Sequence, residues 1–228
     1  MHPTIGVITV GQTPRVDMIP AMQHIFPDNT AIVERGVLDY KTEQEILNLT
    51  PNENQTVLVS RLSNGDKAVI AKEKILPFIQ DLISELNLSG TTMILLACTG
   101  QFPKFTSNVP LIYPDYLLNH VVKGVIQEGT LGVIVPLPEQ KDSIIKKWET
   151  IGLTAIPKAC SPYNFNKSEL IKVASELEKL PIKAIVLDCM GYTEEMKSIV
   201  QENTSKMVFL ARNVIYQNMA ELTSFQNE

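Results

Sequence analysis

Short apolar runs of strand type alternate with amphipathic stretches of helix type along almost the whole chain of 228 residues. The runs at 4–10, 93–97 and 184–187 are apolar nearly throughout, as is typical of parallel strands buried on both faces of a sheet. The stretches at 72–88 and 115–127 have the spacing of amphipathic helices. This alternation predicts an α/β fold with mainly parallel sheets covered by helices.

The dipeptide Asn64-Gly65 separates two β-type runs and is the strongest signal for a β-hairpin in the chain. No internal repeat or low-complexity tract is evident. The apolar runs that lead to Cys98 and Cys189 lie far apart, a spacing that suits two lobes of similar size with one sheet each. We place the boundary between the lobes near 110–115.

The charge balance and the apolar runs limit the classes of partner. The chain has 20 Lys and Arg against 25 Asp and Glu, a net charge of −5, and no basic run, so we expect no nucleic-acid partner. The apolar runs are too short to span a membrane, and the first residues lack the pattern of a signal peptide. We therefore expect a cytoplasmic protein with no membrane partner.

The three cysteines, Cys98, Cys160 and Cys189, are too widely spaced for a disulfide framework or a C-x-x-C metal pair. Cys98 and Cys189 each end an apolar run and precede a turn. Ligands of parallel α/β sheets bind outside the carboxyl ends of the strands, where backbone N–H groups can favour a thiolate that acts as a base or nucleophile. Buried packing is about equally common for one such cysteine, and it is the preferred interpretation of Cys160.

The motif "GQTPR" at 11–15 follows the first apolar run directly. Gly11 permits a tight turn, Thr13 offers a hydroxyl at a helix start, and Arg15 can pair with a carboxylate or phosphate. Asp17 could anchor Arg15 or act in a site itself. A plain capped helix is the alternative. Arg61, at the end of another β-type run, either faces the same site or faces water. No carboxylate or histidine cluster has the spacing of metal ligands, so we expect no metal.

Four stretches together resemble the AroM family: "TIGVITVGQTPRVD", "VSRLSNGDKAVIAKEKI", "ILLACTGQF" and "IVLDCMGYTEEM". Their order and spacing match across nearly the whole chain. The AroM family resembles a divergent branch of the aspartate/glutamate racemase superfamily. The resemblance implies two similar α/β lobes with pseudo-two-fold symmetry and a substrate cleft between them. It also implies that the end of the chain returns to the first lobe, which gives lobes at 1–113 plus 206–228 and at 114–205.

By this resemblance, Cys98 and Cys189 stand where racemases of the superfamily carry one catalytic cysteine per lobe, on opposite faces of the substrate carbon. The implied activity is that of a racemase or isomerase acting on a small carboxylate without a metal or organic cofactor, and a homodimer is the usual expectation for its assembly. The residues expected to bind the substrate lie in the turns of the four stretches: Gly11, Gln12, Thr13, Arg15, Arg61, Thr99, Gly100, Met190, Gly191 and Tyr192.

The sequence departs from the racemase pattern after both cysteines. Racemases usually have Asn-Thr after the first cysteine and Thr after the second, whereas Thr99 follows Cys98 and Met190 follows Cys189 here. Two other interpretations therefore stay open. In the first, the chain is a non-catalytic binder of a small carboxylate or aromatic-pathway metabolite. In the second, the two thiols form a reversible disulfide.

Overall fold

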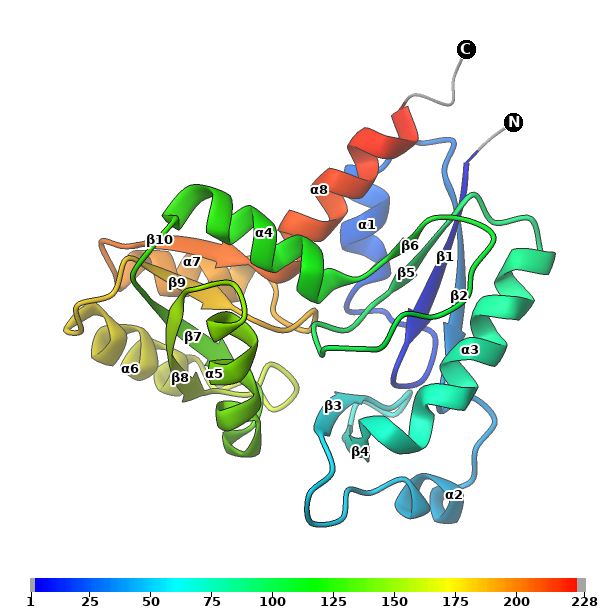
Figure 1. Cartoon of the computed structure of the whole chain (residues 1–228), viewed down its shortest axis with the longest axis horizontal. Coiled ribbons are helices and arrows are strands. Elements are labelled where there is room, and N and C mark those ends of the chain that lie inside the picture. Colours follow the sequence, from blue (N-terminus) through cyan, green and yellow to red (C-terminus); the bar gives the residue numbers. More distant parts are fainter. Residues whose placement is uncertain (1–2, 225–228) are drawn as a thin grey trace. The chain divides into compact units, whose positions relative to one another are not determined.

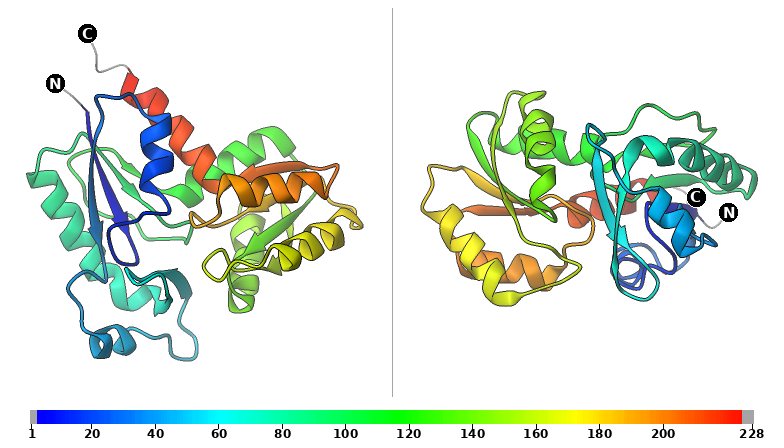
Figure 2. Two further views of the ribbon diagram at one scale, coloured as in Figure 1. Left: turned by 180° about the vertical axis from the view of Figure 1, so that it is seen from behind. Right: turned by 90° about the horizontal axis from the view of Figure 1, so that it is seen from below.

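The structure of the chain is a computed structural model that describes residues 3–224. These residues form two compact units, each with its own sheet and helices (Figures 1 and 2). Unit 1 extends to Pro114 and resumes at Tyr216, and unit 2 comprises Asp115–Ile215. The chain therefore leaves unit 1, builds unit 2, and returns to unit 1 with its last helix.

Unit 1 contains a four-stranded parallel sheet in the order β2-β1-β5-β6, plus an antiparallel hairpin made of β3 and β4. The hairpin turns at Asn64-Gly65, which confirms the prediction from that dipeptide. The strands of this unit are β1 (Thr4–Thr9), β2 (Ala31–Gly36), β3 (Val57–Arg61), β4 (Lys67–Ala71), β5 (Met93–Leu96) and β6 (Leu111–Ile112).

Helix α3 covers one face of this sheet, and α1 and the end of α8 cover the other (Figures 1 and 2). Ile75, Ile79 and Ile83 follow one another at one-turn spacing on α3 and are fully buried in one cluster with Ile8 and Ile94 of the sheet. The helices are α1 (Ile19–Ile25), α2 (Glu43–Asn48), α3 (Lys72–Leu88) and α8 (Ala211–Ser224).

Unit 2 contains a second four-stranded parallel sheet, in the order β10-β9-β7-β8. Helices α6 and α7 cover one of its faces, and α4 and α5 cover the other (Figure 2). The strands are β7 (Thr130–Val135), β8 (Thr154–Ala159), β9 (Ala184–Leu187) and β10 (Met207–Leu210). The helices are α4 (Pro114–Ile126), α5 (Lys141–Glu149), α6 (Lys167–Glu178) and α7 (Glu194–Glu202).

The two sheets are built on the same plan. In unit 1 the central strands β1 and β5 pair with Ile5 opposite Met93, and in unit 2 the central strands β7 and β9 pair with Leu131 opposite Ala184. β1 reads Thr-Ile-Gly-Val-Ile-Thr and β7 reads Thr-Leu-Gly-Val-Ile-Val. The match is too short to mark a repeat in the sequence alone. It puts the carboxyl ends of β5 and β9, which lead to the two cysteines, at equivalent places in their sheets.

The structure corrects two expectations. The last strand, expected in the first lobe, pairs with β9 in unit 2 instead, with Met207 opposite Ala184. The reason is local: α7 is a short crossover helix, and consecutive parallel strands joined in this way usually lie side by side. The motif at 11–15 does not open a helix. α1 begins only at Ile19, and residues 11–15 form a loop in which the backbone N–H groups of Thr13 and Arg15 donate to the side chains of Asp39 and Glu34.

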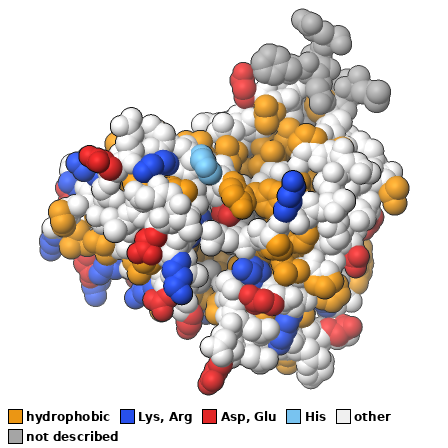
Figure 3. Space-filling model, viewed as in Figure 1, with side chains coloured by type: hydrophobic (Ala, Val, Ile, Leu, Met, Phe, Trp, Pro, Cys, Tyr) orange, Lys and Arg blue, Asp and Glu red, His pale blue; other side chains and the backbone are white. Residues whose placement is uncertain are grey.

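The outer surface has mixed charge where it can be seen. On the face shown in Figure 3, acidic and basic side chains are interspersed rather than segregated, in keeping with a net charge of −5. No helix in the described part of the chain combines the length and the apolar character needed to cross a membrane.

Candidate active site

The two cysteines have the same local geometry in their separate units. Each lies two residues beyond the end of a central strand, and each sulfur accepts a hydrogen bond from the backbone N–H two residues later. The N–Sγ distance is 3.4 Å from Gly100 to Cys98 in unit 1 and 3.4 Å from Gly191 to Cys189 in unit 2. Cys98 is half-buried and Cys189 is buried. Both turns therefore direct a backbone donor at a thiol, and such donors favour the thiolate.

A buried ion pair fixes the residue before Cys189. Lys147 on α5 places its Nζ 2.9 Å from both carboxylate oxygens of Asp188, and the indole Nε1 of Trp148 donates to the same carboxylate at 3.2 Å. The side chains of Lys147 and Asp188 are 2% and 0% exposed. The two charges are therefore held away from water and compensate each other at the residue that precedes Cys189.

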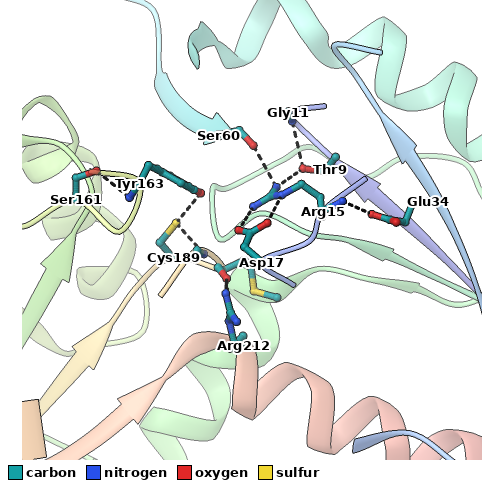
Figure 4. Close-up of polar contacts among 12 residues, drawn as sticks. Thr9, Gly11, Arg15, Asp17, Glu34, Ser60, Ser161, Tyr163, Cys189 and Arg212 are labelled. Carbon is teal, nitrogen blue, oxygen red and sulfur yellow. Dashed lines mark hydrogen bonds and ion pairs between the residues drawn. The ribbon is translucent and has the colours of Figure 1, made fainter. Parts of the chain in front are cut away.

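A second cation holds the other side of the Cys189 turn. Arg212, buried at the start of α8, donates from Nε at 3.1 Å and from Nη2 at 2.9 Å to the carbonyl oxygen of Met190 (Figure 4). This contact fixes the peptide between Met190 and Gly191, whose N–H donates to the Cys189 sulfur. None of Lys147, Asp188 and Arg212 was among the predicted site residues, although a carboxylate that ends an apolar strand is a signal for a buried partner.

Tyr192 and Cys160 belong to the interior of unit 2. The Tyr192 hydroxyl donates to the Cys160 carbonyl oxygen at 2.7 Å, and burial raises the pKa of Tyr192 well above its usual range. Burial also raises the pKa of the Cys160 thiol from 9.0 to about 11. Cys160 is therefore a poor nucleophile, and a structural role is the better interpretation of Tyr192 than contact with a ligand.

Asp115, near the start of α4, is a second buried acid in unit 2. It is 2% exposed, and its Oδ1 accepts no hydrogen bond from the described residues. Burial raises the pKa of this carboxyl from 3.8 to about 6; the positive charge of Lys147 opposes the rise and the negative charge of Asp188 adds to it. Asp115 therefore gains a proton more readily in the folded protein than in the unfolded chain.

This shift gives a pH dependence with a defined sign. The stabilisation from the protonated Asp115 is complete below pH 3.8 and is lost as the pH rises through about 6. We expect Asp115→Asn to gain stability relative to wild type as the pH rises from about 4 to about 7. Urea unfolding of both proteins across this range measures the difference. Asp142→Asn, at an exposed position of α5, is the control, and a constant difference for Asp115→Asn would contradict the assignment.

Arg15 lies in a separate polar cluster of unit 1 (Figure 4). Its guanidinium donates from Nε at 2.9 Å and from Nη2 at 2.8 Å to Asp17, and from Nη1 to Thr9 and to Ser60. The Arg15 and Asp17 side chains are 3% and 10% exposed. Of the two roles considered for Asp17, anchoring Arg15 is the one observed. The pair balances its own charge within unit 1.

The other predicted residues of 11–15 tie this loop to its surroundings. A Cβ at Gly11 would lie 2.4 Å from the Arg61 carbonyl oxygen, so the loop and the end of β3 approach as closely as they do only with glycine there. The Gln12 side chain accepts from the N–H of Ser63 at 2.9 Å, and the Thr13 N–H and hydroxyl each donate to Asp39 at 2.8 Å. These contacts are structural, and Arg61 itself is half-buried.

The described residues offer no ready metal site. Within residues 3–224, no group of three or more His, Cys, Asp or Glu side chains is arranged to hold a metal ion.

Comparison with known proteins agrees with this fold. A family model described as "AroM protein" matches residues 5–223. A search of curated protein sequences gives no significant match. Among solved structures, a liganded double mutant of arylmalonate decarboxylase superposes with a TM-score of 0.66 at 11% identity, covering 99% of this chain and 94% of the other.

Racemases have the same architecture. Glutamate racemase from Aquifex pyrophilus gives a TM-score of 0.60 at 16% identity and covers 96% of this chain and 83% of its own. An aspartate racemase homologue from Pyrococcus horikoshii gives 0.58 at 14% identity, with coverage of 98% and 100%. At these identities the likeness concerns the fold. It confirms the predicted α/β class and the racemase-like fold of two lobes, each with its own parallel sheet.

Proposed function

Because the chain belongs to the AroM family, whose model spans nearly all of it, we propose that it moves a proton at a carbon atom next to a carboxylate, with Cys98 and Cys189 as the acid and the base. The observation that carries this proposal is the matched pair of turns. Equivalent strands of the two sheets each lead to a cysteine whose sulfur accepts a backbone N–H at 3.4 Å. Packing alone does not require the same donor at both sulfurs.

The proposed reaction needs only the two sulfurs. One thiolate takes the proton from the carbon atom, and the electron pair of the broken C–H bond delocalises into the carboxylate. The other thiol then gives its proton to the opposite face of the same carbon atom. The first sulfur ends as a thiol and the second as a thiolate, so the carbon atom is inverted with no net change in composition. No metal or organic cofactor has a role in this step.

The turns after the cysteines are the proposed contacts for the carboxylate. Charge-assisted hydrogen bonds from the backbone N–H groups of these turns, at Thr99, Gly100, Met190 and Gly191, suit an anion. At Gly100 and Gly191 the carboxylate would share the donor with the sulfur. Arg15 was also expected to bind the carboxylate, but it is already paired with Asp17. A substrate would have to compete with that partner, so we propose that Arg15 supports the fold of unit 1 and is not itself a ligand contact.

Hydrogen exchange tests the reaction. Wild-type protein in deuterated water should incorporate deuterium next to the carboxylate of a true substrate, screened among amino acids, hydroxy acids, dicarboxylates and arylmalonates. The last class is included because a solved structure with this fold is an arylmalonate decarboxylase. Cys98→Ser and Cys189→Ser should each slow interconversion by about 10²–10⁴-fold, the usual contribution of a general acid or base. Cys160→Ala, in the interior of unit 2, is the control.

The outcome also separates catalysis from simple binding. If both serine variants retain the activity of wild type, the two-cysteine mechanism is wrong. If a carboxylate binds to all the variants and none of them exchanges its proton, the chain is a binder of small carboxylates and no enzyme of this class.

A further inference from the structure

Tyr163, in the loop after β8, lies against the Cys189 thiol (Figure 4). Its hydroxyl oxygen is 3.5 Å from the sulfur. The same sulfur accepts the Gly191 N–H at 3.4 Å, so a backbone N–H and a side-chain hydroxyl converge on it within unit 2. Nothing in the sequence except an aromatic residue in a loop marks this position.

The approach of Tyr163 depends on the glycine in the cysteine turn. A Cβ added at Gly191 would lie 2.8 Å from both Cζ and the hydroxyl oxygen of Tyr163, closer than such atoms come in proteins. The Tyr163 N–H also donates to Ser161 Oγ at 3.2 Å, which fixes the loop that carries the ring. The hydroxyl is therefore held at the sulfur by its own loop and by the space that Gly191 leaves.

The equivalent residue of unit 1 behaves differently. Directly after β2, the N–H of Val37 donates to the carbonyl oxygen of Thr9. Directly after β8, the N–H of Cys160 donates in the same way to the carbonyl oxygen of Val135, so the two loops start in the same register. Tyr40 then stands where Tyr163 stands in unit 2. Tyr40 is fully exposed and has a φ of 61°. The two loops thus carry a tyrosine at the same position, and the tyrosine of unit 2 is directed at a thiol whereas that of unit 1 is in water.

We infer that Tyr163 is a positioning residue for Cys189 and that its hydroxyl donates a hydrogen bond to the sulfur in the thiolate form. The inference rests on the proposed function in one respect, namely that the thiolate is the form that removes the proton. A thiolate is a better acceptor than a thiol, so an O–H donor at this distance stabilises the charged form. Cys189 would then be held ready as a base by its own unit.

Tyr163→Phe removes the hydroxyl and keeps the ring, so it tests the hydrogen bond without removing the packing. Alkylation of Cys189 by iodoacetamide is followed over a range of pH, with mass spectrometry of peptides to separate Cys98 and Cys160. Loss of a hydrogen bond to a charged group should lower the thiolate fraction about tenfold at neutral pH, which moves the alkylation profile of Cys189 up by about one pH unit. The profile of Cys98 should stay unchanged.

Two further variants sharpen this test. Tyr40→Phe is the matched control and should leave both profiles in place. Gly191→Ala keeps the Tyr163 hydroxyl but displaces the ring, so it should move the Cys189 profile in the same direction as Tyr163→Phe. None of these variants substitutes another charged or titratable residue around the turn. Those residues are Asp188 with its partner Lys147, Tyr192 and Arg212.

The inference and the proposed function fail in different ways. An unchanged Cys189 profile in folded Tyr163→Phe overturns the role of Tyr163, even if deuterium exchange shows that the protein is an enzyme. A shifted profile establishes the hydrogen bond, and it does so even if no carboxylate exchanges its proton in the wild type.

Discussion

Lys147→Met should lower the free energy of unfolding by about 3–5 kcal/mol, as is usual when one partner of a buried ion pair is removed. The Asp188 carboxylate, whose side chain is fully buried, would lose the cation that binds both of its oxygens at 2.9 Å. Urea unfolding followed by tryptophan fluorescence measures the change, because Trp148 contacts the same carboxylate. The matched control is Lys158→Met. Lys158 pairs with Glu176 at 2.7 Å near the surface, and its loss should cost at most about 1 kcal/mol.

A double variant separates charge from packing at this position. Lys147→Met combined with Asp188→Asn removes both charges and should recover part of the lost stability, since the uncompensated carboxylate is the main cost. Equal losses for Lys147→Met and Lys158→Met would show that the buried pair contributes no more than a surface pair.

Arg15→Met should destabilise unit 1 by a similar amount, about 3–5 kcal/mol. It leaves the Asp17 carboxylate, 10% exposed, without its bidentate partner, and removes the donor to Thr9 and Ser60. Arg35→Met is the control, because the Arg35–Glu85 pair is 35% and 52% exposed and should contribute little. Chemical unfolding measures both variants.

A second variant, Arg15→Lys, decides between support and direct binding. Arg15→Lys retains a charge but not the bidentate geometry, so as a support residue it should lose stability and keep most of its affinity for a carboxylate substrate. A loss of affinity in Arg15→Lys without a loss of stability would restore Arg15 as a ligand contact.

The sequence was sufficient for the fold class, for physical reasons that are visible in single segments. β5 and β9 are buried at every position, so their runs are apolar throughout, as is typical of parallel strands covered on both faces. The turn at Asn64-Gly65 needs a residue that tolerates a positive φ, and Gly65 has a φ of 94°. Such local requirements leave a signature in the sequence.

Pairing and long-range polar contacts leave no comparable signature. The pattern of β10 is that of a strand in either sheet, and only the crossover through α7 decides that it pairs with β9. Lys147 lies on an amphipathic helix where a lysine normally faces water, and its burial depends on Asp188, 41 residues away. Tyr163 and Cys189 are likewise brought together by tertiary structure, 26 residues apart. The cysteines could be selected from the sequence, but the residues that set their surroundings could not.

The ion pair next to Cys189 also constrains how this chain can diverge. Loss of the cation at position 147 alone leaves a buried anion, and loss of the carboxylate at position 188 alone leaves a buried cation, so each such single step passes through a destabilised protein. We therefore expect the two charges to be kept together or lost together. Descendants that drift freely at the surface should still carry the same two residues, or a coordinated replacement of both, wherever the cysteine is retained.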